Sequence, residues 1–189
     1  KFTVPQWRGQ PIPGKKLMVW REQGLGDELM FMSTLRDLLA KHDDVIIECD
    51  PRLVITLQRS FPLCLVRTQA FYSPPNGLPV TEDYDFHVPL GSLLGLYRRN
   101  IDQFKNAKPY LIPDPQKLID FKSRINSVKP KVGICWRSGM LSAQRNKHYS
   151  PISSWDAIFK LKDKVEFVNL QYGDCESELL AAEAEFDIK

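Results

Sequence analysis

Alternation of short apolar segments with segments of helical spacing is the feature that most limits what this chain can fold into. The first apolar segment, residues 16–21, predicts a strand, and the apolar residues that follow it recur at helical spacing. Further strands are predicted over 45–49, 63–67 and 84–88, with a candidate fifth at 108–112 and helices over 51–60 and 90–97. Since helices that connect parallel strands make right-handed crossovers, the pattern predicts a Rossmann-like parallel α/β sheet.

The same pattern starts again in the second part of the chain. A helix is predicted over 114–126, a strand over 131–136, a polar loop over 137–150, a helix that begins at Pro151, a strand over 165–171 and a helix over 176–185. We therefore expect an N-terminal Rossmann-like domain with its lead-in over 1–113, a linker helix over 114–130, and an incomplete second Rossmann-like domain over 131–189. Two strands cannot bury both faces of an α/β sheet, and the chain does not begin with Met, so we expect a fragment of a longer protein.

Composition and charge exclude several classes of protein. The chain has 26 Lys and Arg against 23 Asp and Glu, a net charge of +3, and its basic residues are dispersed. This predicts no nucleic-acid partner and allows at most weak attraction to an anionic membrane surface. The four cysteines have no metal-ligand spacing, which indicates buried free thiols in a reducing compartment and no metal site. No apolar stretch approaches the ~20 residues that span a bilayer, and we expect a cytoplasmic protein.

A glycine-rich turn lies between the first strand and the first helix. Gly24 and Gly26 are followed by Asp27 and Glu28, at the carboxyl end of a strand, where open α/β sheets bind ligands. The dinucleotide fingerprint is absent because Leu29 replaces its third glycine, and two carboxylates would repel a pyrophosphate. The turn is therefore predicted to present a carboxylate. The alternative is that Asp27 only caps the helix, a contribution of roughly 0.5 to 2 kcal/mol.

Residues 9–16 nearly spell a phosphate-binding P-loop. Lys16, however, occupies the position of the magnesium-binding Ser or Thr, Pro11 and Pro13 lack backbone donors, and a strand follows instead of a helix. This segment is predicted to be a proline-stiffened lead-in.

Several motifs in succession resemble a known family. They are Gln6-Trp7-Arg8-Gly9, Glu22-Gln23-Gly24-Leu25-Gly26-Asp27, Val132-Gly133-Ile134-Cys135-Trp136-Arg137-Ser138-Gly139 and Phe167-Val168-Asn169-Leu170-Gln171. Together they resemble the glycosyltransferase-like region that follows tetratricopeptide repeats in many bacterial proteins. That region is similar to the ADP-heptose:lipopolysaccharide heptosyltransferases, which have the two-domain GT-B fold. The resemblance spans nearly the whole chain, and it implies no obligatory metal and no organic cofactor.

The resemblance also implies roles for particular residues. Asp27 matches the catalytic base, Lys147 matches the lysine that contacts the donor diphosphate, and Ser138 matches a donor-binding hydroxyl of the same loop. Arg137 and Arg145 would add positive charge in the same loop. Tyr149 stands where the family has a tryptophan, and the family's Asp-Thr/Ser-x-x-His segment, which helps to bind the donor, is expected beyond residue 189.

These roles imply an inverting transfer of a sugar from a nucleotide-sugar donor to a hydroxyl of a glycan, lipid-linked or protein acceptor. A base near the acceptor and cations on the departing diphosphate stabilise charge at both ends of the transition state. A different reading is a non-catalytic Rossmann-like binding or scaffold module beside tetratricopeptide repeats. A nucleotide-dependent oxidoreductase is disfavoured by the missing glycine and the two carboxylates. We also expect self-association through the incomplete second sheet, at the 165–171 strand.

Overall fold

The computed structural model describes residues 2–22, 24–69, 83–105, 107–125, 127–139 and 142–188, without the side chains of residues 143 and 145. The chain forms two compact units, Lys1–Leu118 and Ile119–Lys189, which divide within helix α5 (Pro115–Arg124). This division lies inside the segment 114–130 that the sequence indicates as a linker. No residue of α5 is buried, although its sequence is amphipathic.

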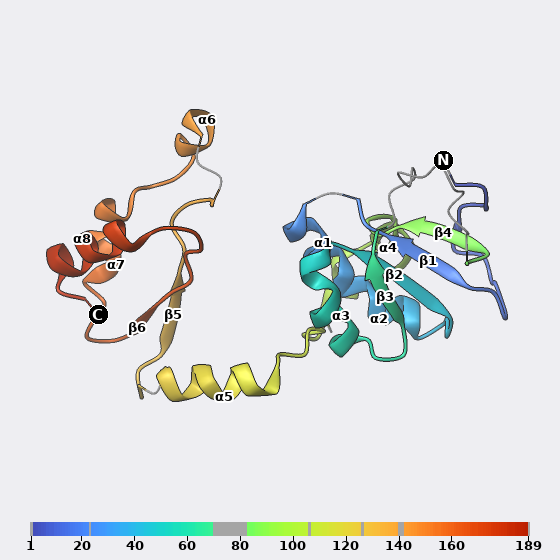
Figure 1. The fold of residues 1–189 in the computed structure, drawn as a ribbon, viewed down its shortest axis with the longest axis horizontal. Coiled ribbons are helices and arrows are strands. Elements are labelled where there is room, and N and C mark those ends of the chain that lie inside the picture. The colour runs from blue at the N-terminus through green and yellow to red at the C-terminus, as the bar shows by residue number, and fades with distance from the viewer. Residues whose placement is uncertain are drawn as a thin grey trace, which may run out of the picture. The chain divides into compact units, whose positions relative to one another are not determined.

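The first unit is built on a parallel sheet, as predicted. Its strands are β1 (Leu17–Trp20), β2 (Val45–Cys49), β3 (Leu65–Thr68) and β4 (Phe86–Pro89), in the order β3-β2-β1-β4 (Figure 1). Every pair is parallel, with Leu17 opposite both Val45 and Phe86. All five residues of β2 are buried, as expected for a strand covered on both faces. The Rossmann-like α/β class is thereby confirmed.

The helices of this unit are short and often divided by 3-10 turns. They are α1 (Leu25–Phe31), η1 (Met32–Thr34), α2 (Leu35–Leu39), η2 (Pro51–Leu53), α3 (Val54–Ser60), α4 (Ser92–Tyr97) and η3 (Ile101–Phe104). Between α1 and α2 the Thr34 hydroxyl donates to the Phe31 carbonyl at 2.7 Å, a local bond of the kind that competes with regular helix. Pro51 begins η2 under an Asp50 cap that accepts from the Arg52 N–H.

The main core of the first unit lies between the sheet and these helices. It contains side chains from the lead-in, the central strands and the helices, among them Trp7, Leu17, Val19, Leu35, Leu38, Ile47, Leu57, Val88 and Leu93. These residues are at most 2% exposed. The lead-in is thus part of the folded unit.

Residues 108–112 do not form the fifth strand that the sequence suggests. Pro109 and Pro113 lack the N–H groups that a ladder needs, so the segment does not pair with the sheet. It is held by side chains instead: the Tyr110 hydroxyl donates to the Leu29 carbonyl, and the Tyr110 ring stacks on Phe61 at 6.0 Å between centroids.

The second unit has one parallel pair of strands in its described residues, β5 (Lys131–Ile134) and β6 (Glu166–Asn169). Its helices are α6 (Ala143–Asn146), η4 (Ile152–Ser154), α7 (Asp156–Phe159) and α8 (Glu176–Phe186). The short helix α6 lies within the segment predicted as a loop. A small core of Ile134, Trp136, Ile152, Phe159 and Ala182 packs against one face of the pair.

On the opposite face of β5 and β6, described side chains are exposed within the second unit. Cys135 is exposed, so the prediction of a buried thiol is wrong here; side chains alternate along a strand, and Ile134 and Trp136 take the packed face. Leu170 lies across Gly133 and remains 61% exposed. Cys49 and Cys64 are buried as predicted, and burial raises their pKa values to about 12 and about 11. In neither unit is a described helix long and apolar enough to cross a membrane.

Candidate functional site

The glycine-rich turn places Asp27 at the carboxyl edge of the first sheet. Gly24 is the N-cap of α1, no side-chain capping bond is made there, and Asp27 is exposed. Within the described part of the chain, the Asp27 carboxylate makes no hydrogen bond and no ion pair. The expectation that Asp27 serves only as a cap therefore finds no hydrogen bond in support.

The two glycines of the turn differ in what they do. A Cβ on Gly24 would lie 3.1 Å from Asp27 Oδ2, so a side chain there would press on the carboxylate. A Cβ on Gly26 would meet nothing within 4 Å. Gly24 is therefore the glycine that lets the Asp27 carboxylate lie against the turn.

Beside Asp27, Glu28 forms a buried charged cluster that sequence reasoning missed. Glu28 is 1% exposed; its Oε1 pairs with Arg21 Nε at 2.7 Å, and its Oε2 accepts the Asp50 N–H at 2.9 Å. Burial raises the pKa of Glu28, against the lowering effect of the Asp50 N–H and of Arg21. The signal was present in the sequence, since Glu28 shares the helical face of Met32 and Leu35 and so falls on the apolar stripe.

Asp50 joins this cluster from the end of β2. It accepts from Arg52 Nε at 2.8 Å and lies 3.3 Å from Arg21 Nη1. The hydrogen bonds from Arg52 hold the pKa of Asp50 well below its usual range. The charged cluster of Arg21, Glu28, Asp50 and Arg52 thus ties the ends of β1 and β2 to the start of α1.

A further carboxylate, Glu22, lies at the switch point of the sheet, where β1 has β2 on one side and β4 on the other. Glu22 Oε2 accepts the Gly91 N–H at 2.6 Å, directly before α4. A Cβ on Gly91 would lie only 2.6 Å from that oxygen. With Glu22, Asp27 and Glu28 at this edge, the turn is suited to accept a proton or bind hydroxyls and disfavours a phosphate.

In the second unit, Gln171 holds the loop that follows β5. Its Oε1 accepts the Trp136 and Arg137 N–H groups at 3.1 and 3.0 Å, while its own N–H donates to Asn169 Oδ1 at 2.8 Å. Gln171 is 8% exposed. These bonds organise the loop that follows β5.

Arg137 is paired within its own unit. Its Nε donates to Glu178 Oε2 at 2.8 Å, and its Nη2 bonds both that oxygen and the Asp174 carbonyl. The hydrogen bond from Arg137 lowers the pKa of Glu178, so the pair is ionised and close to neutral overall. Both residues line a cavity of about 510 Å³, whose other lining residues are Trp136, Asn146, Tyr149, Ser150, Pro151, Asp174 and Ser177.

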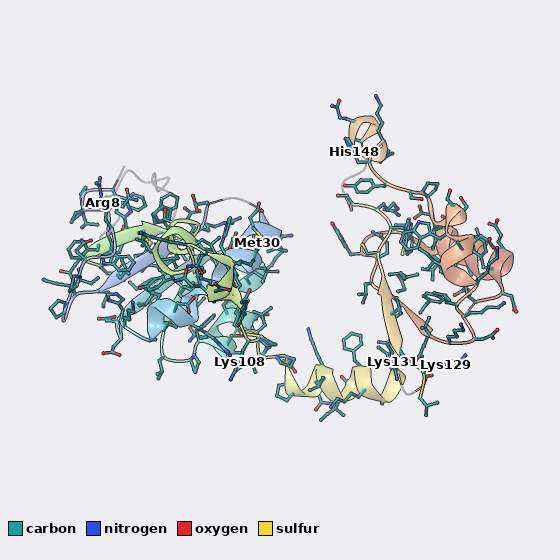
Figure 2. All side chains as sticks on the ribbon, turned by 180° about the vertical axis from the view of Figure 1, so that it is seen from behind. Arg8, Met30, Lys108, Lys129, Lys131 and His148 are labelled. Atoms are coloured by element: carbon teal, nitrogen blue, oxygen red, sulfur yellow. The ribbon has the colours of Figure 1, made fainter. Side chains whose placement is uncertain are left out.

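The other predicted donor residues are less closely gathered. Lys147 is exposed and does not line this cavity, and Ser138 is half-buried beside Arg137 in sequence. His148, which follows Lys147 in the sequence, lies beside α6 (Figure 2). The Arg145 side chain lies outside the described atoms. Asp27 belongs to the first compact unit and these residues to the second. Among the described residues, no group of three or more His, Cys, Asp or Glu is placed to hold a metal ion.

The chain is similar along its whole length to a longer bacterial protein. It is 34% identical over 203 aligned positions to Protein FlbA of Caulobacter vibrioides (strain ATCC 19089 / CIP 103742 / CB 15). The alignment covers all of this chain and 34% of FlbA, so the chain spans about a third of the length of that relative. No protein-family model matches the chain, and no solved structure matches it. The similarity to FlbA therefore includes both compact units.

Proposed function

We propose that this chain is part of a cytoplasmic glycosyltransferase-like protein of the GT-B type, in which Asp27 is the base of an inverting sugar transfer. The donor would be a nucleotide sugar and the acceptor a hydroxyl of a glycan, lipid or protein. The observation that carries the proposal is an exposed carboxylate that has no partner among the described residues, at the carboxyl edge of a parallel sheet. A general base needs an available lone pair within hydrogen-bond reach of the acceptor hydroxyl.

The surroundings of Asp27 support that role. The charged cluster behind it holds α1 through Glu28, so the turn is anchored one residue away from the exposed carboxylate. Preorganised groups of this kind lose little freedom when a substrate binds.

On the donor side, the proposal gives Lys147 the main cationic role. Arg137 is already paired with Glu178, which reduces its attraction for a diphosphate. Arg137 therefore serves in this proposal to shape the cavity beside Tyr149 and Ser150, and Lys147 and Arg145 supply charge from the loop.

The test is a transfer assay on the full-length protein with a panel of nucleotide sugars. Asp27→Asn is expected to abolish transfer while the folded fraction stays that of the wild type, because the side chain is exposed and unpaired. Asp163→Asn, the same change at an exposed position of the second unit, is the matched control and should transfer normally. Wild-type turnover by Asp27→Asn would end the assignment.

The second candidate is a non-catalytic binding or scaffold module, and the pairing of Arg137 with Glu178 favours it. Calorimetric titration of full-length protein with uridine diphosphate and adenosine diphosphate separates the two. If Lys147 contacts a diphosphate, Lys147→Ala should weaken binding by about 1.5 to 3 kcal/mol, as loss of a charge-assisted bond does. Absence of nucleotide binding in the wild type, together with absence of transfer, would support the scaffold.

A further inference from the structure

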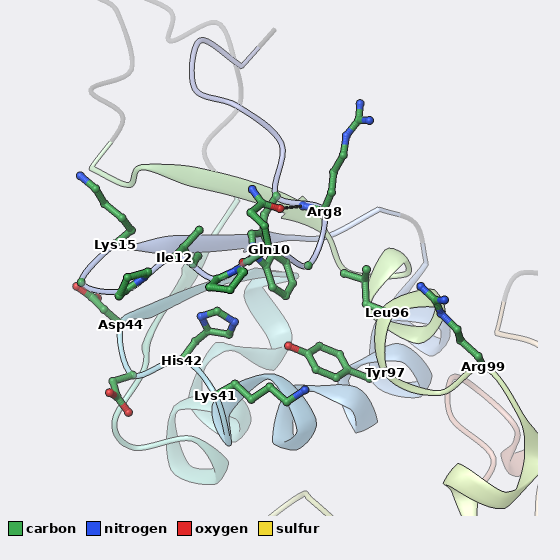
Figure 3. Close-up of a pocket in the computed structure, with 16 residues that line it drawn as sticks. Arg8, Gln10, Ile12, Lys15, Lys41, His42, Asp44, Leu96, Tyr97 and Arg99 are labelled. Carbon is green, nitrogen blue, oxygen red and sulfur yellow. Dashed lines mark hydrogen bonds between the residues drawn. The ribbon is translucent and has the colours of Figure 1, made fainter.

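A cavity of about 800 Å³ lies at the amino edge of the first sheet, opposite the edge that carries Asp27. Its walls come from three segments: the lead-in over 7–15, the connection 41–44 between α2 and β2, and the end of α4. Figure 3 shows these segments around the hollow. The volume falls within the range of about 300 to 1,000 Å³ that small-molecule pockets occupy.

The lead-in is a fixed wall of this cavity. Trp7 is 2% exposed, its N–H donates to the His87 carbonyl at 2.8 Å, and its indole N–H donates to the Gln10 carbonyl at 2.7 Å. Gly9 has a positive φ of 97°, and a Cβ there would lie 3.1 Å from Leu96 Cδ2. The lead-in therefore needs glycine at this close approach to α4, and the wall is built before any ligand arrives.

Two polar side chains point into the hollow. Figure 3 shows the His42 ring and the Tyr97 hydroxyl turned toward the same space below Gln10. Within the described part of the chain, neither makes a hydrogen bond. The His42 ring packs edge-on against the Trp7 ring, with 5.0 Å between their centroids. Burial lowers the pKa of His42, and the nearby charge of Lys41 lowers it further. The neutral imidazole and the hydroxyl can each donate and accept.

Positive charge borders the same space. Lys41 Nζ lies 5.1 Å from the centre of the Tyr97 ring, and Arg99 is a further cation of the lining, whereas the Arg8 side chain extends away from the hollow (Figure 3). Lys15 also lines the cavity, but it is paired with Asp85 at 3.0 Å. Asp43 and Asp44 lie at the beginning of β2, so the lining is not uniformly basic. Among the described residues, Lys41 has no carboxylate partner.

We propose that this cavity is a binding site for a small phosphorylated sugar or polyol. The phosphate lies against Lys41 with Arg99 as the neighbouring cation, and hydroxyls of the ligand bond His42 and Tyr97. Trp7 is almost fully buried and leaves no open ring face for a base to stack on, which disfavours a nucleotide. Because the site is at the amino edge of the sheet, it is separate from Asp27 and does not depend on the transfer reaction.

The experiment titrates the full chain with glucose 6-phosphate, with glucose and inorganic phosphate as separate arms, by calorimetry and by NMR of the His42 ring and the Trp7 indole. Glucose 6-phosphate should saturate and shift both signals. Glucose alone and inorganic phosphate alone should each bind at least about tenfold more weakly than glucose 6-phosphate, since each makes only part of the contacts. Lys41→Gln should weaken glucose 6-phosphate binding about ten- to hundredfold.

Two further variants keep the test decisive. Tyr97→Phe removes one hydroxyl and should weaken glucose 6-phosphate about two- to tenfold while leaving inorganic phosphate binding unchanged. Lys105→Gln, the same loss of charge at an exposed position outside the cavity, should bind as the wild type does. Absence of saturable glucose 6-phosphate binding would overturn the proposal. So would inorganic phosphate that binds as tightly as glucose 6-phosphate, or an unchanged affinity in Lys41→Gln.

Discussion

At the residue scale, neighbouring acidic residues of α1 have opposite surroundings. Asp27 is exposed and has no partner among the described residues, whereas Glu28 is 1% exposed, ion-paired with Arg21 and hydrogen-bonded to the Asp50 N–H. The difference follows from helical geometry, because one helix position turns a side chain by about 100°. A proton acceptor and a structural anchor thus occur side by side in the sequence.

This contrast predicts different costs for the same substitution. Glu28→Ala should lower the free energy of unfolding by about 1.5 to 3 kcal/mol. The substitution removes charge-assisted interactions and leaves the buried Asp50 N–H without its acceptor. Arg21 still pairs with Asp50 at 3.3 Å in this variant, which limits the loss of stability. Asp27→Ala should change stability by no more than about 0.5 kcal/mol. Urea unfolding of the two variants measures both, and equal losses would contradict the distinction.

At the scale of elements, Glu22 links the end of β1 to the start of α4. Gly91→Ala is compatible with a φ of −64°, but its Cβ would displace the Glu22 carboxylate. We expect a loss of about 0.5 to 1.5 kcal/mol, the value of one hydrogen bond. A double-mutant cycle isolates the contact: in a Glu22→Ala background, Gly91→Ala should have almost no effect. An undiminished effect there would show that Gly91 acts through another neighbour.

Some of the helices and strands could be predicted from the sequence, and others could not. The strands of β1, β2 and β4 and helix α8 were predictable because their local patterns agree with their packing. The division of the first helix was not, since it depends on the local Thr34 bond, and residues 108–112 are apolar enough for a strand but contain two prolines at its limits.

The candidate site is predictable to a similar extent. The Asp27 turn follows from a strand, two glycines and a helix in succession. The pairing of Arg137 with Glu178, 41 residues apart, has no local signal, and neither does the tie from Glu28 to Asp50. The amino-edge cavity was missed because its walls come from segments that are distant in the sequence.

At the scale of the whole molecule, ion pairs make stability depend on pH. The pKa values of Asp83, Asp114 and Glu178 are lowered, with Arg67, the Lys117 N–H and Arg137 as the main favourable partners. Lowered carboxyl pKa values contribute stability above their unfolded values of about 4, and this is lost as the pH falls through the folded values. The urea midpoint should therefore fall below about pH 4.

A variant tests the origin of that acid sensitivity. Asp114→Asn removes one of these carboxyls, so its stability should change less between neutral and acidic pH than that of the wild type, although it starts lower. Asp163→Asn, whose carboxyl is exposed, should keep the wild-type slope. Parallel slopes for all three proteins would mean that other groups control acid unfolding.

The burial of Trp7 in the main core limits where the chain can be truncated. The apolar pattern predicts that the first strand begins at residue 16, so a truncated variant could be designed to start there. Such a version would lack the indole and leave a hole in the main core, comparable with a large-to-small core substitution of about 3 to 5 kcal/mol. That loss approaches the whole stability of many domains. Fusion junctions, tags and permuted ends should therefore be placed before Pro5, whose carbonyl already bonds the His87 N–H beside the sheet.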